Sequence, residues 1–284
     1  MKKFIYSLIL ILLSLTVFAV IYLSTIGVET SKFNNIIISK IKEKDPNIQL
    51  SLNKIKIKFD LKNIQIYLTT LEPNILYQDI KIPITEINIY SKISSILRTR
   101  NEINQITLSI KNFNIEDIQK LAVRTKPSNF KTYLLNNLNN GKIEKVLIDV
   151  KLDSDFNIAS YKVNGSVKKI NIKIFDSSII KDVNFNFISD KNLTLINSIS
   201  ANYQDILISN GSINLKKNKQ IEIEGKFNSQ YNLNEDATNK LFPKFNLSFL
   251  DKNKINIKGS LLHKFTLKFD ENFRIVDYDY KSNG

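Results

Sequence analysis

The stretch LSLNKIKIKFDLKNIQIYL, residues 50–68, decides the fold. Apolar and polar side chains alternate from Leu50 to Leu52, and the alternation resumes in the other phase at Ile55. A period of two residues is that of a β-strand with one buried face and one solvated face. The change of phase at Asn53 and Lys54 predicts a bulge or a turn between paired strands.

Alternating runs of the same kind continue along the chain, and short helical patterns interrupt them. The sequence therefore predicts a mainly β protein with few short helices and an antiparallel sheet that has one apolar face. That face needs a cover, so either two sheets pack as a sandwich or one curved sheet leaves a groove for a ligand. Strands are expected at residues 55–59, 64–68, 80–84, 87–89, 106–110, 146–152, 170–174, 183–187 and 206–208, and helices at residues 31–45, 91–98, 115–123, 130–140 and 234–242.

Asparagine–glycine pairs mark the expected hairpin turns. Asn210 and Gly211 stand between two alternating runs, and this dipeptide is the strongest short signal for a hairpin. Asn164 and Gly165 are expected to form a turn for the same reason.

A repeated segment predicts one hairpin unit used twice. The sequence KLDSDFNIASY at residues 151–161 is echoed by KFDENFRIVDY at residues 268–278. The first copy continues through Asn164 and Gly165 into a further strand, whereas the second reaches Asn283 and Gly284. We therefore expect an open strand edge, and a chain that is one part of a longer array.

An uncharged apolar segment, FIYSLILILLSLTVFAVIYLSTIGV, occupies residues 4–28. A helix of about 25 residues is long enough to cross a hydrocarbon core of roughly 30 Å. A cleaved secretion signal is the alternative, because residues 17–19 have an acceptable spacing for cleavage, although apolar residues continue beyond them. Lys2 and Lys3 precede the segment and Glu29 follows it, so the positive-inside rule places the N-terminus in the cytoplasm and the bulk of the chain across the membrane.

The composition narrows the classes of function. The 284 residues include no cysteine, which excludes disulfides, thiolate metal sites and cysteine nucleophiles. The formal net charge of +14 would suit an anionic partner, but Lys, Asn and Ile all have A/T-rich codons, so an A/T-rich genome explains the same charge. Because the lysines stand singly on polar strand positions, without a basic helix or interleaved aromatic residues, no nucleic-acid partner is expected.

Residues for catalysis or metal binding are sparse. His263 is the single histidine, and its alternating context predicts a strand-face residue rather than a base or a ligand. The pairs Asp153/Asp155 and Asp277/Asp279 could bind a cation, but turn and surface positions are expected for them. Since the sequence also lacks the phosphate-loop, dinucleotide and hydrolase motifs, we expect no enzyme activity, no cofactor and no metal site.

The order of these parts resembles the opening of the AsmA-like family, whose members are anchored in the inner membrane of Gram-negative envelopes. The resemblance rests on the N-terminal span, the helix that ends near Asp45 and Pro46, and the strands of residues 50–68. It continues in LEPNILYQDIKIPITEINIYSKISSILR, residues 71–98, and in EINQITLSIKN, residues 102–112. It is a likeness of pattern over residues 1–112, and it carries over no catalytic motif.

The resemblance implies a periplasmic sheet whose apolar groove shelters phospholipid acyl chains on their way to the outer membrane. The alternative is an assembly factor that binds strands of outer-membrane or periplasmic client proteins by β-augmentation. The chain is divided accordingly into a signal-anchor at residues 1–28, a membrane-proximal α+β region at 29–140 and an antiparallel hairpin array at 141–284. The expected lipid-groove residues are Ile55, Ile57, Phe59, Ile64, Ile66, Leu68, Ile80, Ile82, Ile87, Ile89, Ile106, Leu108 and Ile110.

Overall fold

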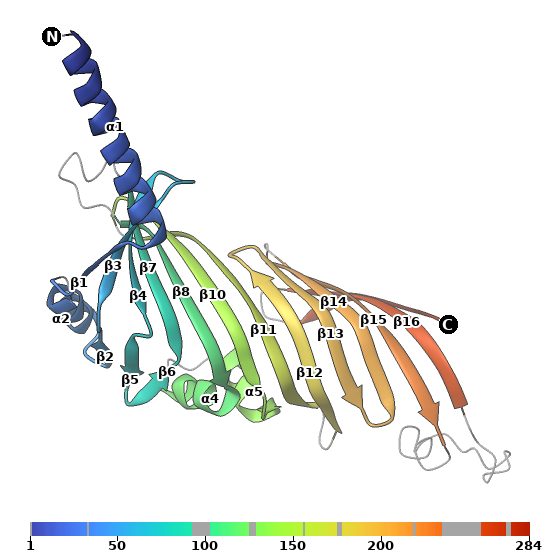
Figure 1. Ribbon diagram of the computed structural model, residues 1–284. Helices are drawn as coiled ribbons and strands as arrows, with labels where there is room; N and C mark the ends of the chain where they lie inside the picture. Colours follow the sequence, from blue (N-terminus) through green and yellow to red (C-terminus); the bar gives the residue numbers. More distant parts are fainter. Residues whose placement is uncertain are drawn as a thin grey trace, which may run out of the picture. The chain divides into compact units, whose positions relative to one another are not determined.

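The structure, a computed structural model, describes residues 2–32, 34–92, 103–124, 129–155, 157–174, 178–217, 220–234, 257–270 and 274–284. The chain is mainly β, with 64% strand and 20% helix, and it has an N-terminal apolar helix and a large antiparallel sheet that is not closed (Figure 1). The mainly β class predicted from the alternating pattern is confirmed. The helices are α1 (Lys2–Thr25), α2 (Asn34–Lys44), α4 (Ile115–Val123) and α5 (Asn129–Asn137).

The strands are numbered in chain order. Those before α4 are β1 (Val28–Thr30), β2 (Ile48–Ser51), β3 (Ile55–Asp60), β4 (Gln65–Leu71), β5 (Asn74–Tyr77), β6 (Ile80–Ile82), β7 (Ile84–Lys92) and β8 (Ile103–Asn114). Those after α5 are β9 (Leu138–Asn139), β10 (Lys142–Leu152), β11 (Ile158–Ile174), β12 (Ser178–Ser189), β13 (Leu193–Tyr203), β14 (Ile206–Lys217), β15 (Ile221–Leu233), β16 (Ile257–Phe269) and β17 (Ile275–Asn283).

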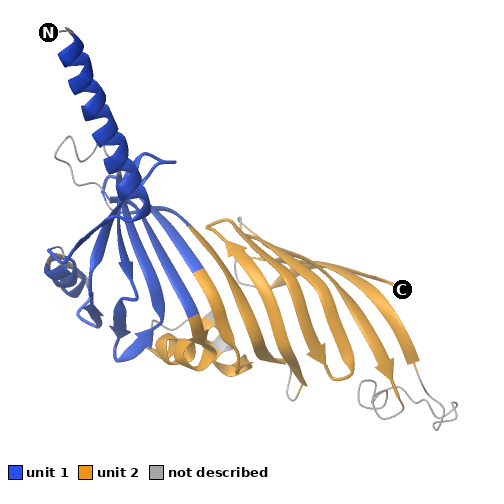
Figure 2. Cartoon of the chain, viewed as in Figure 1, with its two compact units in different colours: residues 1–111, 147–161 blue, residues 112–146, 162–284 orange. Residues whose placement is uncertain are grey.

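The chain forms two compact units (Figure 2). Unit 1 comprises Met1–Lys111 and Leu147–Tyr161, and unit 2 comprises Asn112–Val146 and Lys162–Gly284. Each unit therefore combines two separate segments of the chain. The division into an anchor, an α+β region and a hairpin array stays a prediction.

Unit 1 contains two antiparallel sheets. The larger has the strand order β1-β3-β4-β7-β8, followed by the parts of β10 and β11 that belong to this unit, and the smaller has the order β2-β5-β6. Ile55, which has no exposed surface, is the centre of a buried cluster with Leu50, Leu52 and Ile75. Apolar side chains of α2 pack against this cluster, as the helical spacing of that segment predicts.

The N-terminal helix α1 is joined directly to the sheet of unit 1. Among the described residues, the segment Lys3–Thr25 is long and apolar enough to cross a membrane, with a mean hydropathy of 2.7. The helix ends where the backbone N–H groups of Ile26 and Gly27 donate to the Tyr22 carbonyl oxygen, at 2.9 and 3.0 Å. Gly27 has a φ of +78°, the left-handed conformation common after helices, and β1 then pairs with β3.

Unit 2 contains the first part of β10, most of β11, and β12 to β17 in sequence order, with β9 also paired to β11. The helix α4 has the bounds that the sequence predicts. It packs on the apolar face of the sheet, where Ile115 forms a buried cluster with Val167 and Ile170. The next helix ends at Asn137 rather than at Asn140, because the following residues pair with β11. The helix expected from residue 91 is wrong at its start, because residues 91 and 92 pair in β7. The rest of that helix, residues 93–98, and residues 235–242 of the last expected helix lie outside the described residues.

Four neighbouring strands of unit 2 each contain a non-glycine residue with positive φ. These residues are Lys169 in β11 (+55°), Asp182 in β12 (+53°), Ser198 in β13 (+56°) and Asn210 in β14 (+50°). Each lies at a shift in the pairing register, which is the geometry of a β-bulge. Unit 2 is therefore a sheet with a line of bulges.

The prediction of hairpin turns at the two asparagine–glycine pairs is wrong. Asn210 and Gly211 lie inside β14, and Asn164 and Gly165 lie inside β11. The positive φ that asparagine tolerates in a turn serves a bulge equally well. At position 165 the glycine is needed for close approach, because a Cβ there would lie 2.5 Å from the carbonyl oxygen of Lys145.

The two copies of the repeated segment do form equivalent turns. In the first, Asp153 Oδ1 accepts from the backbone N–H of Asn157 at 2.8 Å, between β10 and β11. In the second, Asp270 Oδ1 accepts from the backbone N–H of Arg274 at 2.9 Å, between β16 and β17. The prediction of one hairpin unit used twice is confirmed for these turns. Asn283, expected in a turn, instead belongs to β17.

Candidate functional site

Ten of the thirteen expected groove residues lie on one face of the larger sheet of unit 1. The strands β3, β4, β7 and β8 place Ile57, Leu68, Ile89 and Ile106 in one cross-strand row, each opposite the next. Residues two positions away along a strand point to the same face, so the neighbouring rows are apolar as well. The ten are Ile55, Ile57, Phe59, Ile66, Leu68, Ile87, Ile89, Ile106, Leu108 and Ile110.

The other three expected residues lie elsewhere in unit 1. Ile64 does not begin a strand; it has a φ of +51° in the turn before β4, and its side chain is 66% exposed. That turn forms because Asp60 accepts hydrogen bonds from Lys62 and Asn63. The hydrogen bonds from Asn63 also hold the pKa of the Asp60 carboxyl below its usual value.

Ile80 and Ile82 belong to the small sheet, opposite Tyr77 and Ile75 respectively. Ile80 is buried there, and Ile82 packs against the cluster around Ile55. These two residues are therefore core residues of unit 1 rather than members of the apolar row.

The apolar face of unit 1 is covered unevenly. At one end α2 and the small sheet pack over Ile55, Leu68 and Ile87. Further along the strands, Phe59 and Ile66, and Ile57, Ile89 and Ile106 of the cross-strand row, lie outside that cluster and are only half-buried. A half-buried apolar row can bind a partner that has no charge or hydrogen-bonding groups at that position.

Unit 2 contains an apolar cavity that the sequence did not predict. Its volume is about 440 Å³, within the range of small-molecule sites. It opens on the same face of the sheet as the α4 cluster, because Ile172 of that cluster is opposite Ile180, and Ile180 is opposite Tyr203, which lines the cavity. The lining side chains are apolar or aromatic apart from one serine and one histidine: Tyr203, Ile206, Ile208, Phe227, Ser229, Tyr231, Leu233, Ile257, Leu261 and His263.

The two polar groups in the cavity form one hydrogen-bonded cluster with a tyrosine. His263 Nε2 lies 2.7 Å from Ser229 Oγ, and His263 Nδ1 lies 2.6 Å from the hydroxyl oxygen of Tyr280. The imidazole also stacks on the ring of Phe227, with 4.5 Å between the ring centres. Burial lowers the pKa of His263 below its ordinary value, so the neutral imidazole is favoured. The histidine thus lies on a strand face, as expected.

The serine and histidine are close enough for a nucleophile and its base. However, Ser229 lies inside β15 and pairs with both Ile208 and Leu261, so the backbone around it is engaged in the sheet. Stabilising an oxyanion requires backbone or side-chain donors that are free to point at it. The described geometry therefore favours a polar cross-link between three strands over a catalytic centre.

Three of the four residues in the acidic pairs have structural partners. Asp153 caps its turn, Asp277 lies 2.8 Å from Lys268 Nζ, and Asp279 lies 3.2 Å from Lys281 Nζ. In the part of the chain that the structure describes, no three acidic or histidine side chains gather in a way that could hold a metal ion.

No family model, no curated protein and no solved structure matches the chain. The resemblance to the AsmA-like family therefore stays a prediction from the pattern of the sequence.

The cavity of unit 2 was missed because its residues change phase within a strand. In β14, Ile206 and Ile208 occupy even positions, but Ile213 and Leu215 occupy odd positions on the same face. The bulge at Asn210 causes this change. The phase change at Asn210 and Gly211 is visible in the sequence, but an asparagine–glycine pair at a phase change predicts a hairpin turn as readily as a bulge.

Proposed function

We propose that this chain is a single-pass inner-membrane protein that holds phospholipid acyl chains on the apolar faces of its periplasmic sheet, and that it serves lipid transport to the outer membrane and envelope integrity. The observation that carries this proposal is the apolar cavity of unit 2. Burying apolar surface is worth about 25 cal/mol per Å², and an acyl chain supplies such surface without polar groups that would be left unpaired.

The half-buried row in unit 1 supports the same function. Ile57, Leu68, Ile89 and Ile106 provide a continuous strip across four strands, and such a strip suits an extended hydrocarbon chain. The N-terminal helix supports a location at a membrane. The charges of Lys2 and Lys3 support a cytoplasmic N-terminus and a periplasmic sheet.

A reporter fusion tests the topology. Alkaline phosphatase fused after Gly284 is expected to be active, because this enzyme requires the oxidising periplasm for its disulfides. An inactive phosphatase fusion together with an active cytoplasmic reporter at the same position would contradict the periplasmic location.

Site-specific photo-crosslinking tests the lipid ligand. A photoreactive residue at Ile208 lies in the cavity, whereas one at Leu207 lies on the same strand and points to the opposite face, where the side chain is 45% exposed. In cells, we expect crosslinks to phospholipid from position 208 and not from position 207, read by mass spectrometry. Equal lipid crosslinking at both positions would mean that the sheet contacts lipid non-specifically at a membrane surface and that the cavity does not bind it.

A charge in the cavity tests whether lipid binding matters for transport. Ile208→Asp would place a carboxylate among acyl chains, and such an unpaired charge costs several kcal/mol. Leu207→Asp is the control with the same charge on the exposed face. We expect loss of lipid delivery to the outer membrane only for the first variant, with both variants folded by circular dichroism.

An assembly factor for outer-membrane proteins is the second candidate function. It is favoured by β17, the last strand in the described order of the sheet, whose Tyr278 and Tyr280 are 75% and 57% exposed. An edge strand of this kind can pair with a client strand. Crosslinks from Tyr278 to outer-membrane proteins, without lipid crosslinks from position 208, would favour this candidate.

A further inference from the structure

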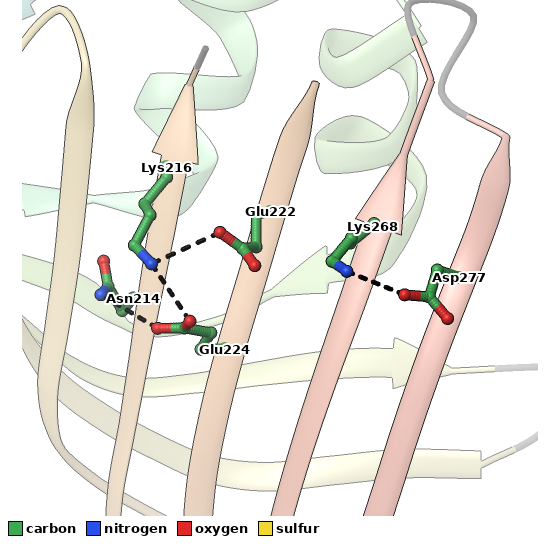
Figure 3. Close-up of polar contacts among 6 residues, drawn as sticks. All are labelled: Asn214, Lys216, Glu222, Glu224, Lys268 and Asp277. Carbon is green, nitrogen blue, oxygen red and sulfur yellow. Dashed lines mark hydrogen bonds and ion pairs between the residues drawn. The ribbon is translucent and has the colours of Figure 1, made fainter. Parts of the chain in front are cut away.

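The polar face of unit 2 carries two cross-strand rows of charge that differ in sign pattern. In the first row, Lys216, Glu222, Lys268 and Asp277 stand opposite one another on β14 to β17, so positive and negative side chains alternate. Figure 3 shows the resulting contacts: Lys216 Nζ lies 3.3 Å from Glu222 and 3.1 Å from Glu224, and Lys268 Nζ lies 2.8 Å from Asp277.

The second row is uniformly positive over three strands. Lys226 on β15 is directly opposite Lys264 on β16, which is directly opposite Lys281 on β17. Directly opposed residues of an antiparallel pair have Cα atoms about 5 Å apart, and like charges at that separation destabilise the pairing. In the first row the same strands place opposite charges next to each other. The second row departs from that arrangement, because its neighbouring charges are all positive.

Two of the three lysines in the second row lack a compensating acid. Asp279 lies 3.2 Å from Lys281 Nζ, and Glu224 is already bound by Lys216 and by the amide of Asn214. Among the described residues, neither Lys226 nor Lys264 forms an ion pair with a carboxylate.

The lysines line a hollow in the sheet. It has a volume of about 480 Å³ and lies entirely within unit 2. Ser212, Thr266 and Asn197 add hydroxyl and amide groups to the same hollow. The carboxylates of Glu224 and Asp279 also line it, and they are paired with Lys216 and Lys281 respectively. The ammonium group of lysine binds phosphate as a compact positive charge, and hydroxyl and amide groups donate hydrogen bonds to the remaining phosphate oxygens.

We propose that this hollow binds a phosphate group, either as free inorganic phosphate or as a phosphate monoester at the head of a lipid. A phosphate monoester carries a charge of about −1.5 to −2 and three acceptor oxygens, which matches the two uncompensated ammonium groups of Lys226 and Lys264. A carboxylate, with one charge, would leave one of the two lysines unmatched. The site lies on the face opposite the apolar cavity, and it does not depend on the proposed lipid-holding function.

Calorimetric titration of the full chain in uncharged detergent micelles tests this site. The probes are inorganic phosphate, and short-chain phosphatidic acid as the lipid-borne monoester. Lys264→Gln removes the central lysine of the row, and Lys258→Gln is the matched control: it is also exposed, lies on the same strand and face, and is opposite a neutral residue, Asn232. We expect Lys264→Gln to weaken binding about tenfold and Lys258→Gln to change it less than twofold.

The two probes distinguish the source of the phosphate. Binding of both probes with the same dependence on Lys264 would indicate that the phosphate group alone is recognised. Binding of phosphatidic acid alone, with that dependence, would indicate a lipid head group. The proposal is overturned if neither probe binds, if Lys258→Gln weakens binding as much as Lys264→Gln, or if a hexaglutamate peptide binds as well as phosphate. Thermal unfolding without probe checks that both variants are folded.

Discussion

The apolar face of unit 1 and the apolar cavity of unit 2 are both made by alternating strands, but they differ in how regularly those strands pair. From β3 through β4 to β7 the register never shifts, so Ile57, Leu68 and Ile89 keep one phase. From β11 to β15 every pairing contains a shift, and the apolar face moves from even to odd positions within β14. The comparison teaches that alternation identifies a face only between bulges, and that each bulge must be located before the pattern is extended.

The largest change in stability is expected at one of two residues that the alternating pattern assigns to the same apolar face, Ile55 and Ile64. Ile55→Ala removes a side chain with no exposed surface and should lower the free energy of unfolding by about 2–5 kcal/mol, because a cavity remains in a packed core. Ile64→Ala, in an exposed turn, should change it by less than about 0.5 kcal/mol. Urea unfolding of the full chain in micelles measures both. Similar losses would mean that Ile64 is part of the core.

The bulges of unit 2 depend on side-chain amides from neighbouring strands. Asn184 Oδ1 accepts from the backbone N–H of Lys169 at 3.0 Å, and Asn184 Nδ2 donates to the Asp182 carbonyl oxygen at 2.7 Å. Asn184→Ala should therefore lower the free energy of unfolding by about 1 kcal/mol. Asn186→Ala, two residues further along the same strand, removes no side-chain hydrogen bond among the described residues and should have a smaller effect. If the two variants unfold at the same urea concentration, the amide does not stabilise the bulge.

The cluster around His263 should make unit 2 sensitive to acid. Burial lowers the pKa of His263 in the folded chain, whereas the unfolded chain has an ordinary value of about 6.5. The unfolded state therefore binds the proton more readily, so stability is full above about pH 6.5 and falls as the pH drops from there towards the folded pKa. His263→Gln should remove this part of the pH dependence. Urea midpoints at pH 8, 6.5 and 5 check it, and an unchanged difference between the two proteins across this range would contradict it.

The smallest effect is expected in the alternating charged row. Lys268→Gln breaks the ion pair with Asp277 at 2.8 Å, and because both side chains are well exposed the loss of stability should be slight and should vanish at high salt. Lys258→Gln, which breaks no ion pair among the described residues, is the control. Melting temperatures at low and high salt compare the two, and a loss that persists at high salt would mean that Lys268 stabilises the strand by packing.

Much of unit 1 could be predicted from its sequence because local pattern and pairing agree there. The spacing of apolar residues was sufficient for α2 and for the shared face of Ile57 and Ile89. The position of Ile64 could not be predicted from alternation, because the turn depends on hydrogen bonds from Lys62 and Asn63 to Asp60.

The cavity of unit 2 depends on contacts between distant strands. Ser229 and His263 are 34 positions apart, and their meeting depends on the pairing of β15 with β16. Tyr280 joins them only because β17 pairs on the other side of β16. Alternation assigned each strand a face, but it gave no register between strands, so the cluster of the three could not be predicted.

The short connection between α1 and β1 has a mechanical consequence. Only Ile26 and Gly27 separate the helix from a strand that pairs directly with β3, and a Cβ at position 27 would lie 2.8 Å from the carbonyl oxygen of Ile57. Glu29, in that strand, is further tied to Lys54 and Lys56 at 3.0 and 3.3 Å. The junction is therefore short and is held by strand pairing and by two ion pairs. If α1 lies in a bilayer, a tilt or a vertical displacement of the helix would move β3 with it. The height of the Ile57 row above a membrane surface would then be set by how deeply the helix is seated.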